Sequence, residues 1–242
     1  VAGMAGIRGS TAHNATIEVR NNIVSITGGA NANGQMIPIS VVAGSRLGRP
    51  ASSSVFNSVT ISGNTIQNCV YPATGTDDMW LLFCGRSSID TLGAYNTFIT
   101  GNTLTNNTNS STKTTGTMYG IIYQVPTDSL SISNNIITNN TVNGASAYGM
   151  RMLLTGLGGF GTGTVPWVHK LNVSGNTLSG NVTTSTTGSM DNVYVETYVG
   201  SSPLAGSTVT IDNNNVGNTT LTNISTSTFN GVVSTVSTNI AL

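Results

Sequence analysis

The sequence predicts an all-β, single-domain β-solenoid of about six coils, with three short strands in each coil. Three observations lead to this prediction. One short phrase of alternating aliphatic and polar residues recurs six times, an asparagine holds the same place in every copy, and a second apolar segment follows each copy. Fixed repeats of about 20 to 50 residues are typical of solenoids, in which stacked units bury one continuous core.

The repeated phrase reads IEVRNNIV, VTISGNTI, TFITGNTL, LSISNNII, LNVSGNTL and VTIDNNNV. Its aligned asparagines are Asn22, Asn64, Asn102, Asn135, Asn176 and Asn214, and subtraction gives spacings of 42, 38, 33, 41 and 38 residues. In every copy the residues three before and two after the asparagine are aliphatic. Apolar and polar residues alternate up to the asparagine, which predicts a half-buried strand on that side and a second strand after it.

The two aliphatic positions lie an odd number of residues apart, so the chain must turn between them if both face the interior. Asparagine tolerates a left-handed backbone better than other residues with a side chain, and we expect the turn at this position. A regular column of asparagines also predicts a ladder of side-chain amides that hydrogen-bond from coil to coil.

The second apolar segment predicts the third strand of each coil. It reads MIPISVV, MWLLFC, YGIIYQV, YGMRMLL, NVYVETYV and NGVVSTV. Some copies are apolar on both faces, and one of these faces cannot enter the core. We therefore expect Trp80, Tyr194 and Tyr198 on the outside, covered by a loop, in contact with a neighbouring subunit, or forming a stacking platform for sugar rings.

The V-x-I-x-x-N-x-I phrase resembles the PbH1-type repeat of right-handed parallel β-helix proteins, the pectin-lyase-like superfold, from about Ile17 to Val236. The resemblance implies right-handed coils, as does the usual hand of crossover connections. It places the repeats approximately at 15–53, 54–91, 92–127, 128–166, 167–204 and 205–242 of one domain. This fold hosts lyases, hydrolases, phage tailspikes, adhesins and passive spacers, so function must come from the sites.

The composition argues against several classes of partner. Eight basic and eight acidic residues balance, and charged residues make up only 7% of the chain. Such a chain offers no basic field to nucleic acid or to anionic lipid. No run of eighteen apolar residues occurs, so we expect no membrane span.

Candidate catalytic groups are sparse. The enzymes that share this fold act on acidic glycans and use clustered carboxylates, but only Asp77 and Asp78 are adjacent acids here. We interpret that pair as a polar turn in preference to a metal or catalytic site. His13 and His169 lie in different coils, so a serine-histidine-aspartate arrangement is disfavoured. We expect no catalytic residue, no metal site and no cofactor.

Two further features concern covalent chemistry. Cys69 and Cys84 are the only cysteines, and they form either a disulfide or two buried thiols. Sequons of the form N-x-S/T permit N-glycosylation of a secreted chain at Asn14, Asn106, Asn109, Asn139, Asn172, Asn181, Asn218 and Asn223.

The two ends of the repeat region show neither an amphipathic helix nor charged gatekeeper residues that would cap a solenoid. Head-to-tail stacking, excision from a longer surface protein and caps made of loops all explain this. We therefore expect an extracellular or cell-surface structural solenoid, either a filament subunit or an adhesin stalk, which self-associates head to tail or laterally. The alternative is a carbohydrate-binding or polysaccharide-degrading protein, with Trp80, Tyr194 and Tyr198 as the sugar platform and Asp77, Asp78 or Glu196 as acids.

Overall fold

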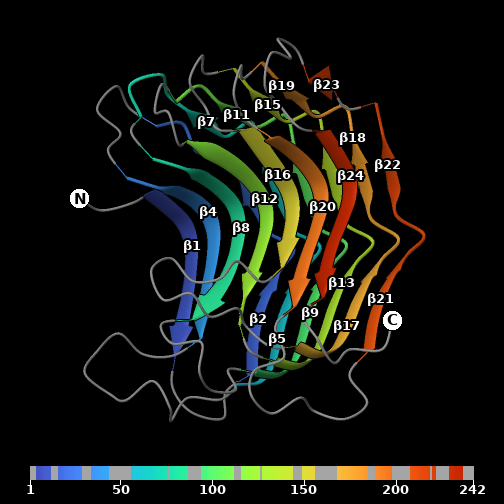
Figure 1. The fold of residues 1–242 in the computed structure, drawn as a ribbon. Coiled ribbons are helices and arrows are strands. Elements are labelled where there is room, and N and C mark those ends of the chain that lie inside the picture. Colours follow the sequence, from blue (N-terminus) through green and yellow to red (C-terminus); the bar gives the residue numbers. More distant parts are fainter. Residues whose placement is uncertain are drawn as a thin grey trace.

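The computed structural model is built entirely from strands, turns and loops in the residues that it describes. These are residues 4–11, 16–28, 34–43, 56–75, 77–86, 94–111, 116–125, 127–143, 149–155, 168–184, 189–197, 208–218, 220–221 and 229–236. Successive coils stack on one another, and their strands pair in parallel in every sheet (Figure 1). The prediction of an all-β parallel β-helix is confirmed.

The strands form four parallel sheets. Sheet A contains β1 (Met4–Thr11), β4 (Met36–Ala43), β8 (Met79–Arg86), β12 (Thr117–Gln124), β16 (Gly149–Thr155), β20 (Ser189–Thr197) and β24 (Phe229–Val236). Sheet B contains β2 (Thr16–Arg20), β5 (Phe56–Ser62), β9 (Ala94–Thr100), β13 (Thr127–Ser133), β17 (Val168–Ser174) and β21 (Thr208–Asp212). Sheet C contains β3 (Ile23–Val24), β6 (Thr65–Gln67), β10 (Thr103–Thr105), β14 (Ile136–Thr138), β18 (Thr177–Ser179) and β22 (Asn215–Gly217). Sheet D contains β7 (Val70–Tyr71), β11 (Thr108–Asn109), β15 (Thr141–Val142), β19 (Val182–Thr183) and β23 (Thr220–Leu221).

The chain passes through sheets B, C, D and A in that order in each coil, so a coil has four strands where the sequence predicted three. The fourth strand is the one in sheet D, which is only two residues long. In the first coil, the corresponding segment is reduced to a single bridge between Thr27 and Val70. Two residues are too few to show an alternating pattern, which is why this strand escaped the sequence analysis.

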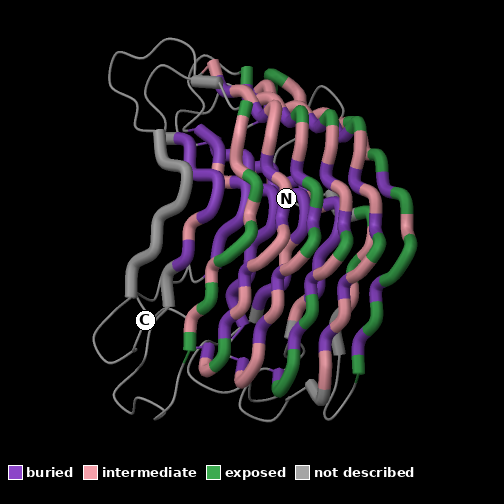
Figure 2. The backbone as a smooth tube through the Cα atoms, turned by 90° about the vertical axis from the view of Figure 1, so that its right-hand side faces the viewer, coloured by how far each residue is buried: buried purple, intermediate pink, exposed green. Residues whose placement is uncertain are grey.

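The aliphatic residues on either side of the asparagine turn face one interior, as the repeat predicts. Ile61 and Ile66 of the second coil, for example, are both fully buried and belong to one cluster that extends through the stack. Figure 2 shows buried residues alternating with intermediate and exposed residues along successive coils. The core is therefore a continuous column that no single coil could bury alone.

The six aligned asparagines form one hydrogen-bonded ladder at the turn between sheets B and C. In the first five of them, Nδ2 donates to the Oδ1 of the asparagine in the next coil, at 2.8 to 3.0 Å. The backbone N–H of the same residue donates to that Oδ1 at 3.0 to 3.1 Å. The second Nδ2 hydrogen reaches back to the preceding coil, as from Asn102 to the carbonyl oxygen of Ile61 at 2.9 Å. Because the turn is buried, these amides satisfy backbone groups that water cannot reach.

The left-handed residue of each turn is the one before the ladder asparagine, not the ladder asparagine itself. It is Asn21, Gly63, Gly101, Asn134, Gly175 or Asn213, with φ between 53° and 65°. The expectation that the ladder residue makes the bend is therefore wrong. The ladder residue must point its amide inward, so the preceding residue takes up the left-handed conformation, which glycine and asparagine tolerate.

A second asparagine ladder lies at the turn between sheets C and D. The Nδ2 atom of Asn107 donates to Oδ1 of Asn140 at 2.9 Å, and that of Asn140 donates to Oδ1 of Asn181 at 3.0 Å. These residues come five positions after the first-ladder asparagine in three consecutive copies. That spacing is visible in the sequence and is the signal that the sequence analysis missed. Sheet C is thus held by a ladder along each of its two sides.

Cys69 occupies the second ladder one coil before Asn107. Its backbone N–H donates to Oδ1 of Asn107 at 2.9 Å, while its sulfur lies 3.9 Å from the carbonyl oxygen of Val24. The backbone amide of Ile26 donates to the sulfur, and burial raises the pKa of this thiol. A cysteine at this place replaces two strong amide donors by one weak one.

The candidate disulfide between Cys69 and Cys84 is wrong, because both residues are free, buried thiols. Cys69 is held in the turn between sheets C and D, whereas Cys84 stands on sheet A beside Tyr123 of the next coil. Burial raises the pKa of the Cys84 thiol to about 12, so it stays protonated in the folded protein near neutral pH.

The first ladder should be a main determinant of stability. We expect Asn135→Ala to lower the free energy of unfolding by about 3 kcal/mol or more. The substitution leaves the Asn102 donors and the Ile99 carbonyl oxygen buried without these hydrogen-bond partners. Urea denaturation measures the change. The matched control, Asn96→Ala at an exposed position of β9, should change stability by less than about 0.5 kcal/mol. Equal effects of the two substitutions would contradict the role of the ladder.

The second ladder can be extended by one residue. We expect Cys69→Asn to raise the free energy of unfolding by about 1 kcal/mol, since the new amide can donate to Val24 O and to Asn107 Oδ1 as Asn107 itself does one coil later. Cys84→Asn, which buries the same amide against the core without a ladder, should instead destabilise the protein. A loss of stability in Cys69→Asn, measured in the same urea titration, would refute this prediction.

Candidate functional site

The outer face of sheet A brings together two ranks of side chains from β8, β12, β16 and β20. The strand pairing aligns one rank in the order Trp80, Tyr119, Arg151 and Asp191. The same pairing aligns a second rank in the order Phe83, Ile122, Leu154 and Tyr194. Neighbouring members of a rank come from successive coils, about 4.8 Å apart across a sheet.

Each of these strands bends in its middle, which places both ranks on one face although they lie three residues apart. The bend lies where one residue of each strand has no directly paired residue in the neighbouring strands. In β12 this residue is Gly120. A Cβ atom on Gly120 would collide with the carbonyl oxygen of Met152 in the next strand, so a glycine is needed there. In β8, Leu81 and Leu82 both face the core. The side chains of MWLLFC therefore do not alternate strictly between the two faces of the sheet.

Four aromatic residues gather on this face. The ring centroids of Trp80 and Phe83 are 4.9 Å apart, and those of Trp80 and Tyr119 are 6.2 Å apart with the rings edge to face. Trp80 and Tyr119 retain only 5% and 9% of their exposure, whereas Phe83 and Tyr194 are half-buried. Burial, and next the nearby Asp78 carboxylate, raise the pKa of Tyr119. Phe83 and Tyr194 pack against the buried cluster of Trp80, Tyr119, Ile122 and Leu154.

A polar pair lies beside these aromatic residues. The Nε atom of Arg151 is 3.0 Å from Oδ2 of Asp191, which is 3% exposed, while Arg151 keeps 27% of its exposure. The Arg151 guanidinium also lies 5.1 Å from the centre of the Tyr194 ring. A cation over an aromatic face is attracted by the ring, and the carboxylate fixes the orientation of the guanidinium. The pair therefore presents fixed hydrogen-bond donors next to a half-buried aromatic ring.

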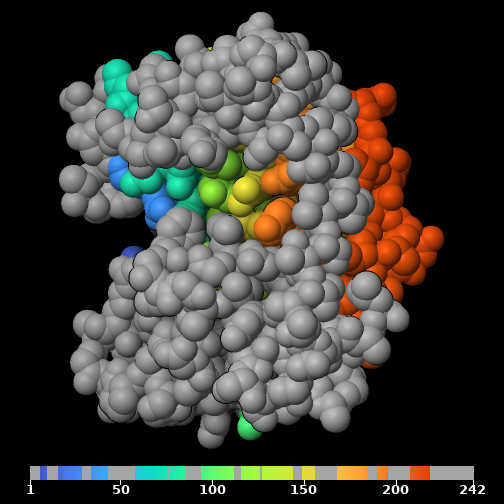
Figure 3. Space-filling view, in the orientation of Figure 1, coloured from blue at the N-terminus to red at the C-terminus, as the bar shows by residue number. Residues whose placement is uncertain are grey.

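In Figure 3, atoms of the described residues of this face, coloured from blue through green and yellow to orange, form a band that crosses the strands of sheet A. We call this band the sheet A groove and define it by Phe83, Tyr119, Arg151, Asp191 and Tyr194. Largely apolar sites with a few fixed polar groups are typical of ligand-binding sites.

Of the three predicted platform residues, the structure places Tyr194 in this groove and Trp80 beneath it. Trp80 and Tyr194 share the outer face of sheet A, as the sequence analysis expected, although Trp80 lies almost entirely beneath its neighbours. Tyr198 and the side chain of Glu196 lie outside the described residues. Tyr119, Arg151 and Asp191 were missed. They come from three different coils, and only the register of the strands reveals that they meet.

The carboxylates of Asp77 and Asp78 accept hydrogen bonds from backbone amides. Oδ1 of Asp78 accepts a hydrogen bond from the amide of Thr117 at 2.9 Å, which joins the second coil to the third. Oδ1 of Asp77 accepts from the amide of Asp78 at 2.9 Å. The amide of Asp77 donates to the hydroxyl of Tyr71, which in turn donates to Gly34 O at 2.8 Å. These contacts agree with the interpretation of the pair as a polar turn.

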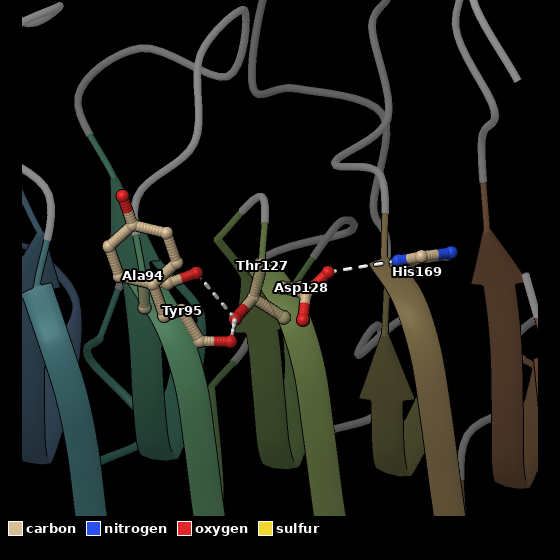
Figure 4. Close-up of polar contacts among 5 residues, drawn as sticks. All are labelled: Ala94, Tyr95, Thr127, Asp128 and His169. Atoms are coloured by element: carbon tan, nitrogen blue, oxygen red, sulfur yellow. Dashed lines mark hydrogen bonds and ion pairs between the residues drawn. The ribbon is translucent and has the colours of Figure 1, made fainter. Parts of the chain in front are cut away.

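The outer face of sheet B carries a separate polar contact (Figure 4). The Nδ1 atom of His169 lies 2.9 Å from Oδ1 of Asp128, one coil away. Beside them, the hydroxyl of Thr127 donates to Ala94 O at 2.9 Å. His13 lies outside the described residues, so its position relative to this pair is not described. No group of three or more histidine, cysteine or acidic residues that could hold a metal occurs within the described ranges.

The eight sequons fall into three groups. Asn106, Asn139 and Asn218 are exposed at turns, and Asn172 is half-buried on sheet B. Asn109 and Asn181 are fully buried, and Asn181 belongs to the second ladder. These two candidate glycosylation sites are therefore wrong for the folded protein, because a buried amide has no room for a glycan. Asn14 and Asn223 lie outside the described residues.

Across the residues with a described position, there is no helix long and apolar enough to cross a membrane. Comparison with known proteins adds no family to this fold and this site. No family model, no curated protein and no solved structure matches the chain.

Proposed function

We propose that this chain is an extracellular β-solenoid that binds a carbohydrate chain in the sheet A groove without cleaving it. The observation that carries the proposal is the guanidinium of Arg151, which is fixed by Asp191 and lies over the half-buried ring of Tyr194. Sugar rings offer apolar C–H faces to aromatic side chains and hydroxyl groups to oriented donors and acceptors. The right-handed, pectin-lyase-like character of the coils belongs to the same proposal and is supported by the V-x-I-x-x-N-x-I phrase and by the usual hand of crossover connections.

Binding without turnover is supported by the contacts of the nearby acids. Asp191 is paired with Arg151, and Asp78 caps the amide of Thr117. Hydrolysis of a glycoside typically needs two carboxyl groups placed on either side of the scissile bond. Here both carboxylates bind groups of the protein itself, Arg151 and the amide of Thr117, so their main effect on a ligand is indirect.

The groove makes a direct prediction for binding. We expect Tyr194→Ala to weaken binding to a soluble polysaccharide about tenfold, because loss of one stacked ring removes roughly 1.4 kcal/mol. Affinity electrophoresis in gels that contain xylan, galactomannan, dextran or polygalacturonate measures the change. The control is Tyr95→Ala, since Tyr95 is 50% exposed on sheet B, away from the groove. Absence of binding to the whole panel, or equal losses in the two variants, would refute the proposal.

End-to-end assembly into a filament is the second candidate, and one observation favours it. Val209, Ile211 and Val216 on β21 and β22 are partly exposed, whereas their counterparts one coil earlier, Leu171, Val173 and Leu178, are buried. A second copy would cover them. Sheet A has seven described strands, whereas sheets B and C have six each. If β1 of one copy pairs with β24 of another, sheets B and C each lack one strand at the junction. Further residues would have to supply these strands, which is why we rank this candidate second.

Assembly through this edge predicts a mass that depends on concentration. Under this candidate, light scattering should show particles that grow as the protein is concentrated, and negative-stain microscopy should show rods of uniform width. Ile211→Lys should abolish the growth, because a charge on the open core cannot be buried against another copy. Thr210→Lys, on the outer face of the same strand, should leave the growth unchanged. A constant monomeric mass at all concentrations would eliminate the candidate.

A further inference from the structure

The outward side chains of sheets C and D form a surface without charge. In the described residues of these strands and of the turns beside them, no aspartate, glutamate, lysine, arginine or histidine occurs. The one aromatic residue in these segments is Tyr71, and it is buried. The charged residues of the described coils lie instead on or beside sheets A and B, as in the pairs Arg151–Asp191 and Arg20–Glu18.

Uncharged side chains, most of them short or β-branched, occupy this surface in three ranks, two on sheet C and one on sheet D, which we call the hydroxyl face. The strand pairing aligns them across successive coils. The ranks are Thr65, Thr103, Ile136 and Thr177; Gln67, Thr105, Thr138 and Ser179; and Val70, Thr108, Thr141 and Val182. Neighbours in a rank are about 4.8 Å apart, and the first two ranks, two residues apart along the strand, are separated by about 6.6 Å.

The hydroxyl face is held rigidly from beneath. The first asparagine ladder runs along one side of sheet C and the second ladder along the other, so buried hydrogen bonds fix both ends of β10, β14 and β18. The hydroxyl groups of Thr105 and Thr138 are also 3.2 Å apart, within hydrogen-bonding distance. β-branched side chains are stiff at χ1. The repeat of hydroxyl and methyl groups is therefore fixed before any partner arrives.

The chemistry of the face disfavours most kinds of partner. Nucleic acids and anionic membranes need basic residues, and this face has none among its described residues. Protein partners are held chiefly by tryptophan, tyrosine and arginine, whereas serine, threonine and valine are under-represented among residues that dominate binding. Sugar rings are stacked by exposed aromatic residues, which the described part of this face also lacks. An uncharged, periodic partner that forms hydrogen bonds remains.

We propose that the hydroxyl face binds ice. An ice surface is an uncharged, periodic array of hydrogen-bonding oxygen atoms, which matches a neutral face with a fixed two-dimensional repeat. The hydroxyl groups can hold a layer of water, and the methyl groups of threonine, isoleucine and valine limit where that water sits. A rigid face loses little conformational freedom when it binds, so even weak contacts with each water molecule add up over the ranks.

The test compares the wild-type protein with two charge variants. We expect the wild-type protein to slow recrystallisation of ice in a sucrose film and to produce faceted crystals with measurable thermal hysteresis. Thr105→Lys, in the centre of the hydroxyl face, should reduce both effects at least tenfold at equal concentration. The matched control is Thr60→Lys, which adds the same charge to a half-buried threonine on the outer face of sheet B and should keep both activities. Circular dichroism and light scattering establish that all three proteins are folded and have the same mass.

Each outcome decides the matter. A folded wild-type protein that neither shapes ice nor slows recrystallisation overturns the proposal, as does an equal loss in both variants. If Thr105→Lys changes only the mass seen by light scattering, the face is a contact between copies and the ice proposal fails. The test is independent of carbohydrate binding, because the hydroxyl face and the sheet A groove lie on different sheets.

Discussion

The fold depends on the asparagine amides that join one coil to the next. In a stack of parallel coils the chain turns at buried positions, where backbone amides and carbonyls cannot form hydrogen bonds with water. The Oδ1 atom of Asn102 accepts both a side-chain and a backbone hydrogen bond from Asn64, while its Nδ2 atom binds the preceding coil and the next one. One side chain thus closes the hydrogen bonds of a turn and sets the distance between coils. The aliphatic core can form only because these polar groups are satisfied.

The ladders also determine how the surface is divided. The first ladder holds the chain at the same turn in successive coils, and the second does so at a further turn in three of them, so residues with the same place in the repeat lie on the same sheet. The loops of variable length join a strand of sheet D to one of sheet A, or a strand of sheet A to one of sheet B. Charge and aromatic residues therefore accumulate on and beside sheets A and B, while sheet C and its neighbour keep a uniform, uncharged pattern. Two surfaces of different chemistry result from one repeat.

The turn before each ladder residue shows a further constraint between coils. The side chain of Asn21 fills the space that a Cβ atom on Gly63 would occupy, and Asn134 stands in the same relation to Gly175. Both partners have a left-handed backbone. Asparagine in one coil therefore favours glycine in the next, although Asn106 followed by Asn139 shows that two asparagines can also be accommodated. The choice between the two residues is set across coils and not within one turn.

The features that repeat locally could be predicted from the sequence. The period-two pattern identified the strands of sheet B, the apolar segments identified those of sheet A, and the aligned asparagines identified the first ladder. The other features depend on contacts between coils. The two-residue strands of sheet D carry no readable period, and the bend of sheet A placed Leu81 and Leu82 together in the core. Arg151 and Asp191 are 40 residues apart in the sequence, and they meet because their strands pair in register. Coil lengths vary, so the register that brings side chains together is set by the packing of whole coils, which no local pattern records.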